Sequence, residues 1–196
     1  MRGGPITAKW DLWLAQLQHE VLTLFFYRKL WRMYIDAAVA ANVPSSYMFT
    51  FQQESYATRQ AVAIRRLCTA RSGQYSFRNL LTEIRDHPKL TANPTNRQEV
   101  AADIQSLNTG NLRQVHTYVD KFVAHKQQPA VAVTATHDDI DAAIDQLGEV
   151  LLKYLLLVQK ERLMLDTVIA GDVMGPFRMA WLPPLPERPT RMRPVK

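Results

Sequence analysis

A lysine and a histidine stand four residues apart near the middle of the chain, at Lys121 and His125. Residues four apart lie side by side on an α-helix, so this ammonium and this imidazole can face the same ligand. An imidazole exchanges protons near neutral pH, and a neighbouring cation attracts a phosphate group. The pair therefore predicts either acid–base chemistry beside a phosphate or a positive helix C-terminus with a structural role.

Apolar spacing around this pair predicts a helix that begins after Gly110 and ends with His125. Its expected buried stripe consists of Val115, Val119, Phe122 and Val123. A polar strip along the edge of the stripe consists of Gln114, Tyr118, Lys121 and His125. Arg113 and His116 are expected to project elsewhere. His125 then lies at the edge of a core, where a ligand or a second subunit can reach it.

The rest of the chain also has helical spacing. Prolines, glycines and capping residues divide it into helices over about residues 8–41, 46–71, 76–87, 95–108 and 137–164. Thr136 with Asp138 and Asp139 predicts an acidic N-terminal cap for the last helix. Residues 131–134 lack a predicted strand partner and are expected to form an extended connector. We predict an all-α bundle of four to five main helices with short extra helices.

The C-terminal part is expected to form an irregular extension. Phe177, Met179, Trp181 and Leu182 are expected to pack back on the body. Residues 183–196 form a basic, proline-rich tail in which four basic residues outnumber Glu187, and this tail carries half of the net charge of +6. Such a tail contacts RNA or an acidic protein surface, or it extends without a partner. We therefore predict a helical domain over residues 1–182 and a tail over residues 183–196.

Composition argues against several classes of protein. Cys68 is the only cysteine, which excludes an internal disulfide and a cysteine-based zinc cluster and predicts a cytoplasmic protein. The most apolar run, residues 150–158, contains Lys153 and is too short to cross a bilayer, and no secretory signal follows the N-terminus. No glycine-rich phosphate loop or metal-binding histidine motif is present. We expect no cofactor, no metal and no membrane association.

Four segments match, in order and spacing, the motifs of one protein family. They are YATRQAVAIRRL (residues 56–67), YSFRNLLTEI (75–84), YVDKFVAH (118–125) and DVMGPFRMAW (172–181). In these segments the chain resembles the abortive-infection, AbiU-type branch of the HEPN (higher eukaryotes and prokaryotes nucleotide-binding) proteins. The resemblance implies a HEPN-like helical bundle that forms a homodimer and acts on RNA.

The resemblance also implies a catalytic motif, from which this chain departs. In HEPN proteins four to six residues separate an arginine from a histidine, and two copies meet across the dimer to form a metal-independent ribonuclease site. His125 matches the histidine, but the positions for arginine hold Tyr118, Val119 and Asp120. Lys121 can supply a point charge without the planar fork of an arginine. The implied site has His125 as general acid or base, Lys121 as electrostatic partner and Tyr118 as a positioning or stacking group.

Other basic residues are candidates for RNA contacts. Arg65 and Arg66 on the second predicted helix, and Lys126 beside His125, either reach a phosphate channel or form a solvated face. Two functions remain open. The first is a defence or stress protein that acts on RNA as a weakened metal-independent endoribonuclease. The second is a catalytically inactive dimer that acts through protein contacts as an antitoxin, sensor or scaffold, with the C-terminal extension as one contact surface. Both predict a homodimer, because the first helix has more large apolar residues than one bundle face buries.

Overall fold

Helices dominate the computed structural model, which describes residues 4–40, 47–91, 95–124 and 135–159. The long helices are α1 (Pro5–Ala40), α2 (Tyr47–Cys68) and α6 (His137–Val158). The short ones are α3 (Phe77–Asp86), α4 (Arg97–Ser106) and α5 (Gly110–Tyr118). A 3-10 turn, η1 (Pro88–Leu90), follows α3, and a π-helical segment, η2 (Val119–Ala124), continues α5. No strand occurs in these ranges, and the predicted all-α fold is confirmed.

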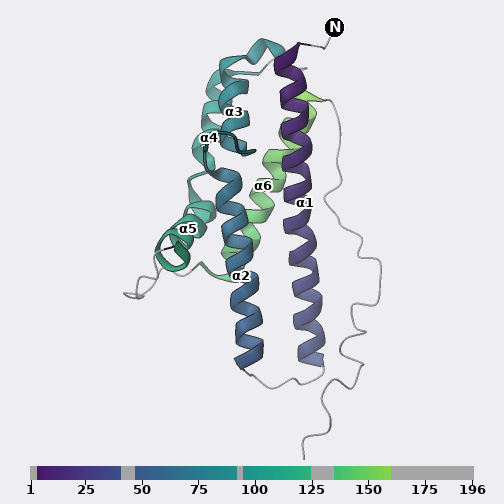
Figure 1. Cartoon of the computed structure of the whole chain (residues 1–196), viewed down its shortest axis with the longest axis vertical. Coiled ribbons are helices and arrows are strands. Elements are labelled where there is room, and N and C mark those ends of the chain that lie inside the picture. The colour runs from purple at the N-terminus through teal and green to yellow at the C-terminus, as the bar shows by residue number, and fades with distance from the viewer. Residues whose placement is uncertain (1–3, 41–46, 92–94, 125–134, 160–196) are drawn as a thin grey trace, which may run out of the picture.

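The long helices lie alongside one another, α4 and α5 lie on the side of α2 away from α1, and α3 lies beyond the upper end of α2 (Figure 1). α1 packs on α6, α6 on α5, and α5 on α2, while α3 packs on α4. Among the described residues, none of the helices combines the length and apolar character that a bilayer crossing requires. The predictions for residues 131–134, for Phe177 to Leu182 and for the tail fall outside the described residues.

Capping residues account for several helix starts. The side chain of Ser76 accepts a hydrogen bond from the backbone N–H of Asn79 at 3.2 Å, and Asn96 caps α4 in a similar way. Thr136 and Asp139 form a reciprocal capping box at the start of α6, with bonds of 2.8 Å and 3.1 Å. Each cap satisfies backbone donors that have no partner within the helix. The acidic cap predicted for α6 is confirmed.

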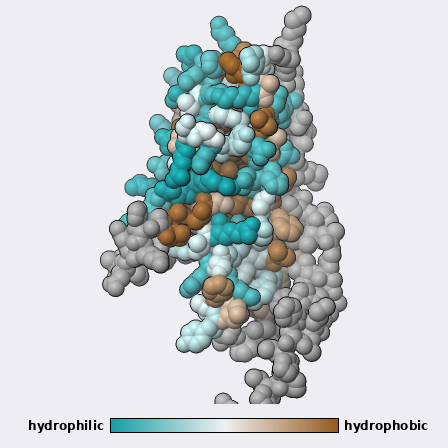
Figure 2. All heavy atoms as spheres, in the orientation of Figure 1, coloured by the Kyte–Doolittle hydropathy of each residue, from teal (hydrophilic) through white to brown (hydrophobic). Residues whose placement is uncertain are grey.

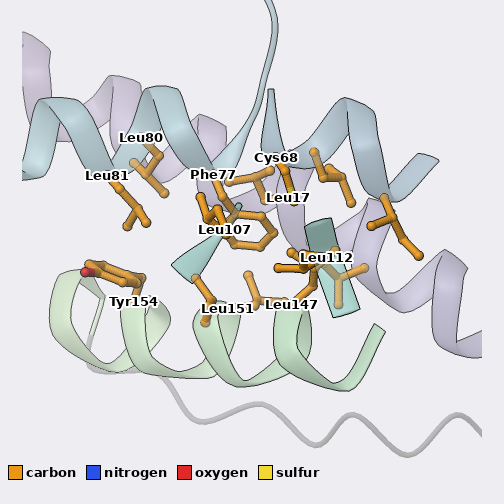
Figure 3. Close-up of a cluster of buried hydrophobic side chains, with 14 of the residues drawn as sticks. Leu17, Cys68, Phe77, Leu80, Leu81, Leu107, Leu112, Leu147, Leu151 and Tyr154 are labelled. Atoms are coloured by element: carbon orange, nitrogen blue, oxygen red, sulfur yellow. The ribbon is translucent and has the colours of Figure 1, made fainter. Parts of the chain in front are cut away.

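The core lies where α1, α2, α3, α5 and α6 meet. α1 contributes fully buried side chains at three- and four-residue spacing, namely Trp10, Leu14, Leu17 and Val21. Figure 3 shows Phe77 of α3 at the centre of a cluster that includes Cys68 and Leu107, with Leu147 and Leu151 of α6 facing it. Burial of these apolar surfaces provides most of the driving force for folding.

A buried tyrosine ties α4 to α6. Tyr154 is fully buried, and its hydroxyl donates to Oδ2 of Asp103 at 2.6 Å. Lys153 Nζ lies 2.7 Å from the same oxygen and 2.7 Å from Oε1 of Glu99. Burial raises the pKa of Tyr154, and the hydrogen bond to Asp103 raises it further. The hydroxyl therefore remains protonated and serves as a permanent donor to α4.

The lower halves of α1 and α2 project beyond the short helices as a two-helix arm, residues 25–40 and 47–59 (Figure 1). Gln60 marks its base, because this buried side chain donates to the backbone oxygen of Leu24 at 3.0 Å. Within the described residues of the arm, only Ala37 and Ala38 are buried. Figure 2 shows hydrophobic patches at the surface of this projecting end. The arm therefore has few fully buried side chains, and many of its residues are partly buried.

Two arginines fasten α1 to the first turns of α6. Arg28 donates to the backbone oxygen of Asp141 at 3.0 Å and to Asp145 at 2.7 Å. Arg32 donates to the Asp141 carboxylate at 2.6 Å. The acidic residues of α6 are thus used in ion pairs and in the helix cap. Within the described ranges, no group of three or more histidine, cysteine or acidic residues is arranged to hold a metal ion.

Candidate phosphate-binding site

The segment after α5 winds differently from the sequence-based expectation. α5 ends at Tyr118, and Val119–Ala124 is π-helical, with hydrogen bonds between residues five apart. The predicted side-by-side placement of Lys121 and His125 assumes α-helical winding, and the described part of this segment, which includes Lys121, is π-helical. His125 and Lys126 themselves fall outside the described residues. Their roles remain predictions, and the site is built from their neighbours.

The predicted buried stripe is confirmed at its described positions. Val115 and Val119 are buried, and Val123 packs against the core. Tyr118 is half-buried against the core, with its hydroxyl 3.4 Å from Oγ1 of Thr58, while Lys121 is exposed. Of the three positions that lack the expected arginine, Val119 faces inward and Tyr118 packs on the core. Asp120 has a different contact.

An arginine from another helix reaches Asp120. Nη2 of Arg65 on α2 lies 2.5 Å from Oδ1 of Asp120. The two side chains are 29% and 48% exposed, so the pair adds little stability and its oxygen and nitrogen atoms stay open to a competing ligand. Through this contact, α2 supplies a guanidinium group to η2, which contains no arginine of its own.

A cavity of about 370 Å³ opens beside this ion pair. Its lining includes Arg65 and Cys68 of α2, Arg78 of α3, Asn108 before α5, His116 of α5 and Asp120 of η2. Two arginines and a histidine oppose one carboxylate, which gives the cavity a positive balance suited to an anion. Guanidinium groups bind phosphate through paired, charge-assisted hydrogen bonds. The lining can therefore bind a phosphate group.

His116 is the one titratable base in this lining. Its Nδ1 lies 3.4 Å from Oδ1 of Asn108, and its Nε2 is buried without a hydrogen bond to any described residue. Burial lowers the pKa of His116, Arg65 and Arg78 lower it further, and Asp120 acts in the opposite direction. The imidazole is therefore neutral at pH 7, and a bound anion would favour its protonation.

Of the two arginines predicted either to reach a phosphate channel or to form a solvated face, Arg65 lines this cavity. Arg66 pairs with Glu20 at 2.5 Å and is absent from the cavity lining. Consecutive helical residues point about 100° apart, because an α-helix has 3.6 residues per turn. His116 projects away from the predicted polar strip, and the cavity lies on the face of α5 that carries His116. Nothing in the sequence indicated Arg78.

Cys68 adds no nucleophile to the cavity. Its side chain is buried, and burial raises the pKa of the thiol to about 12. A cysteine reacts as its thiolate, so this thiol is inert at neutral pH. The cavity therefore offers cations and one imidazole, which suit binding of a phosphate and transfer of a proton.

The free energy of unfolding is expected to fall as the pH drops below about 6.5, the ordinary pKa of histidine. Because the pKa of His116 is lowered in the folded state, the unfolded chain takes up the proton first as the pH falls. The free energy of unfolding then decreases with pH until His116 is protonated in the folded state as well. Above that range His116 contributes no pH dependence. Urea denaturation at pH 7.5 and pH 5.5 would show a smaller loss in His116→Gln than in the wild type. An equal loss in both would contradict the prediction, and the exposed His87→Gln serves as the matched control.

Comparison with protein families gives one match. The HEPN_AbiU2 family model, described as AbiU2, matches residues 7–173. The match includes all the cavity residues and the first three of the four segments quoted above, and it ends two residues into the fourth. Comparisons with curated proteins and with solved structures gave no significant match.

Proposed function

Because the chain belongs to the AbiU2 family of HEPN proteins, an abortive-infection family, we propose that it is a defence protein that binds RNA through the cavity lined by Arg65, Arg78 and His116. One observation carries the proposal. The Arg65 guanidinium contacts Asp120, within the segment where the HEPN motif would carry its arginine. RNA presents a phosphate at every nucleotide, and guanidinium groups are its usual partners.

Arg65 takes the role of the missing motif arginine from a different helix. A phosphate of the RNA displaces Asp120 from the guanidinium, since the ion pair is partly exposed and weak. Arg78 lies on the same cavity and adds a second cation. Two guanidinium groups stabilise the charge that develops on phosphoryl oxygens during cleavage. Lysine at position 121 cannot reproduce this planar contact.

His125 supplies the acid–base step in this proposal. An imidazole removes the proton from the ribose 2′-hydroxyl, whose oxygen attacks the adjacent phosphorus while the bond to the 5′-oxygen breaks. A second imidazole, from His116 or from His125 of a second copy, protonates the leaving 5′-oxygen. Such cleavage needs no metal ion. We propose that the active form is a cytoplasmic homodimer, with Tyr118, Lys121, Arg66 and Lys126 as secondary contacts for RNA.

Incubation of labelled RNA with the purified protein in EDTA tests this function. We expect products from the wild type and none from His125→Ala or Arg65→Ala, with all three proteins folded by circular dichroism. Retention of RNA on a filter by His125→Ala would separate binding from cleavage. Intact RNA and no retention with the wild type would reject both parts of the proposal.

A second candidate function is a catalytically inactive HEPN dimer that acts through protein contacts. The burial of Val119 favours it, since this motif position is fixed in the core and cannot present a cation. In this case RNA stays intact, and light scattering gives a mass of twice 22.5 kDa. A protein partner would then bind equally well to His125→Ala and to the wild type.

A further inference from the structure

The arm carries an aromatic groove that the proposed RNA site does not use. The groove has a volume of about 350 Å³ and lies between the two helices of the arm. Its lining includes Tyr27, Trp31 and Tyr34 of α1 and Phe51, Tyr56 and Arg59 of α2. None of these residues lines the cavity of Arg65 and His116.

The rings along this groove are held by one another. Trp31 stacks on Tyr34 at 5.4 Å and on Tyr56 at 4.9 Å between ring centres, and Tyr34 stacks on Phe49 at 6.1 Å. The Tyr34 hydroxyl also donates to the side-chain oxygen of Gln52. These contacts join α1 to α2 and fix the positions of the rings that line the groove. A preformed apolar groove binds a ligand at a lower entropic cost than one that must be assembled.

The groove has a polar end, and charged side chains of both signs lie on the arm around it. Arg59 donates to the Tyr27 hydroxyl at 2.8 Å, and its guanidinium lies 3.9 Å from the centre of the Tyr27 ring. Asp36 and Glu54 are exposed on the arm, which also carries Arg28, Lys29, Arg32 and Arg59. An extended and mainly apolar peptide matches the aromatic lining.

We propose that the groove binds the proline-rich segment of the same chain, residues 182–189, in a polyproline II conformation. This segment reads Leu-Pro-Pro-Leu-Pro-Glu-Arg-Pro. Closely spaced prolines fix the backbone angle φ near the polyproline II value, so the segment loses little entropy when it binds. Grooves lined by tyrosine and tryptophan are the usual receptors for such segments, because proline rings pack on aromatic faces.

Chain length permits this contact within one molecule. Gln159 at the end of α6 donates to Asp11 of α1 at 3.0 Å, which places the start of the C-terminal part near that residue. Trp31 lies twenty residues further along α1, a distance of about 30 Å. The 24 residues from Gln159 to Pro183 span up to about 80 Å when extended.

Photo-crosslinking from the groove tests the proposal in the full-length chain. A benzoylphenylalanine in place of the exposed Phe51 is expected to link to the peptide of residues 182–189 within one molecule, so the mass of the protein does not change. Replacing Pro183, Pro184 and Pro186 with serine should lower the yield about tenfold, because the bound conformation is no longer preset. A probe at the exposed Tyr75 is the matched control and should give no such product, because Tyr75 lies in the turn between α2 and α3, beyond the end of α2 that is far from the groove.

Peptide binding provides a second measurement. A labelled peptide of residues 181–191 should bind the triple-serine variant at least about tenfold more tightly than the wild type, whose own segment competes at a high effective concentration. Adding Phe51→Ala to that variant should remove the binding. Equal binding to both proteins would overturn the proposal. In the photo-crosslinking experiment, a crosslink to a second copy, whether to its α1, its α2 or its tail, would also overturn the proposal. A crosslink to added RNA or the absence of any crosslinked product would do the same.

Discussion

Replacing Arg65 and Arg78 together with alanine is expected to weaken RNA binding about 10- to 100-fold at 0.1 M salt. Hydrogen bonds to charged groups contribute about 1.5–3 kcal/mol each when a ligand depends on them. The combined loss is expected to stay below the sum for two such bonds, because Arg78 is exposed and Arg65 exchanges one partner, Asp120, for another. Titration of a labelled single-stranded RNA by fluorescence anisotropy measures the change.

Salt dependence distinguishes loss of phosphate contacts from damage to the fold. Each phosphate neutralised on a single strand contributes about 0.7 to the slope of log K against log salt, so the double variant should lose about 1.4 from that slope. A misfolded protein would lose affinity without this change of slope. If the double variant kept both the slope and the affinity of the wild type, neither arginine would belong to the RNA-binding surface.

Two further variants act as controls for charge. Asp120→Asn removes the carboxylate that competes for Arg65, and it should raise RNA affinity a few-fold. Arg85→Ala with Arg97→Ala removes the same net charge as the double variant, but Arg85 pairs with Asp86 and neither arginine lines the cavity. This control should change affinity much less than loss of Arg65 and Arg78.

Phe77→Ala is expected to lower the free energy of unfolding by about 3–5 kcal/mol. The ring is fully buried at the start of α3 and lies at the centre of the cluster in Figure 3. Its removal loses the transfer free energy of the ring and leaves a cavity, since neighbours on α2 and α6 are held by their own helices. For a chain of this size, the melting temperature should fall by about 10 °C.

Leu12→Ala is the matched control, since Leu12 is 52% exposed and its removal opens no cavity in the core. Its free energy of unfolding should stay within about 0.5 kcal/mol of the wild type. Denaturation of both variants in urea, read by circular dichroism at 222 nm, gives the comparison. A loss under 1 kcal/mol for Phe77→Ala would mean that the neighbouring side chains refill the space.

The elements of the fold could be predicted because their signals are local. Apolar residues at three- and four-residue spacing, such as Trp10, Leu14 and Leu17, determine a helix and its buried face together. Thr136 and Asp139 mark a helix start within four residues. Even so, the second helix was predicted to continue to about residue 71, whereas α2 ends at Cys68. Gly73 adopts a left-handed φ of +74° in the turn that leads to α3.

The candidate site could not be predicted as a whole, because it combines residues that are far apart in the chain. Arg65 meets Asp120 across 55 residues, and Arg78 comes from a third helix. Helix spacing gave the direction of His116 but not what it meets there. The π-helical winding of η2 has no signal in residue type, because it depends on how the segment packs on α2 and α5. Local patterns therefore located the helix edge and missed the partners that complete the site.

The π-helical segment also changes what a motif spacing means. A helix that gains one residue per hydrogen-bonded turn absorbs a single-residue insertion without shifting the face that its flanking turns present. Two chains can therefore differ by one residue between an arginine and a histidine and still direct both toward the same place. Counting along the sequence would treat those two chains as different motifs. In this segment, rotational phase about the helix axis is the quantity that relatives should share, and an alignment that allows a one-residue gap within residues 119–124 would compare them on that basis.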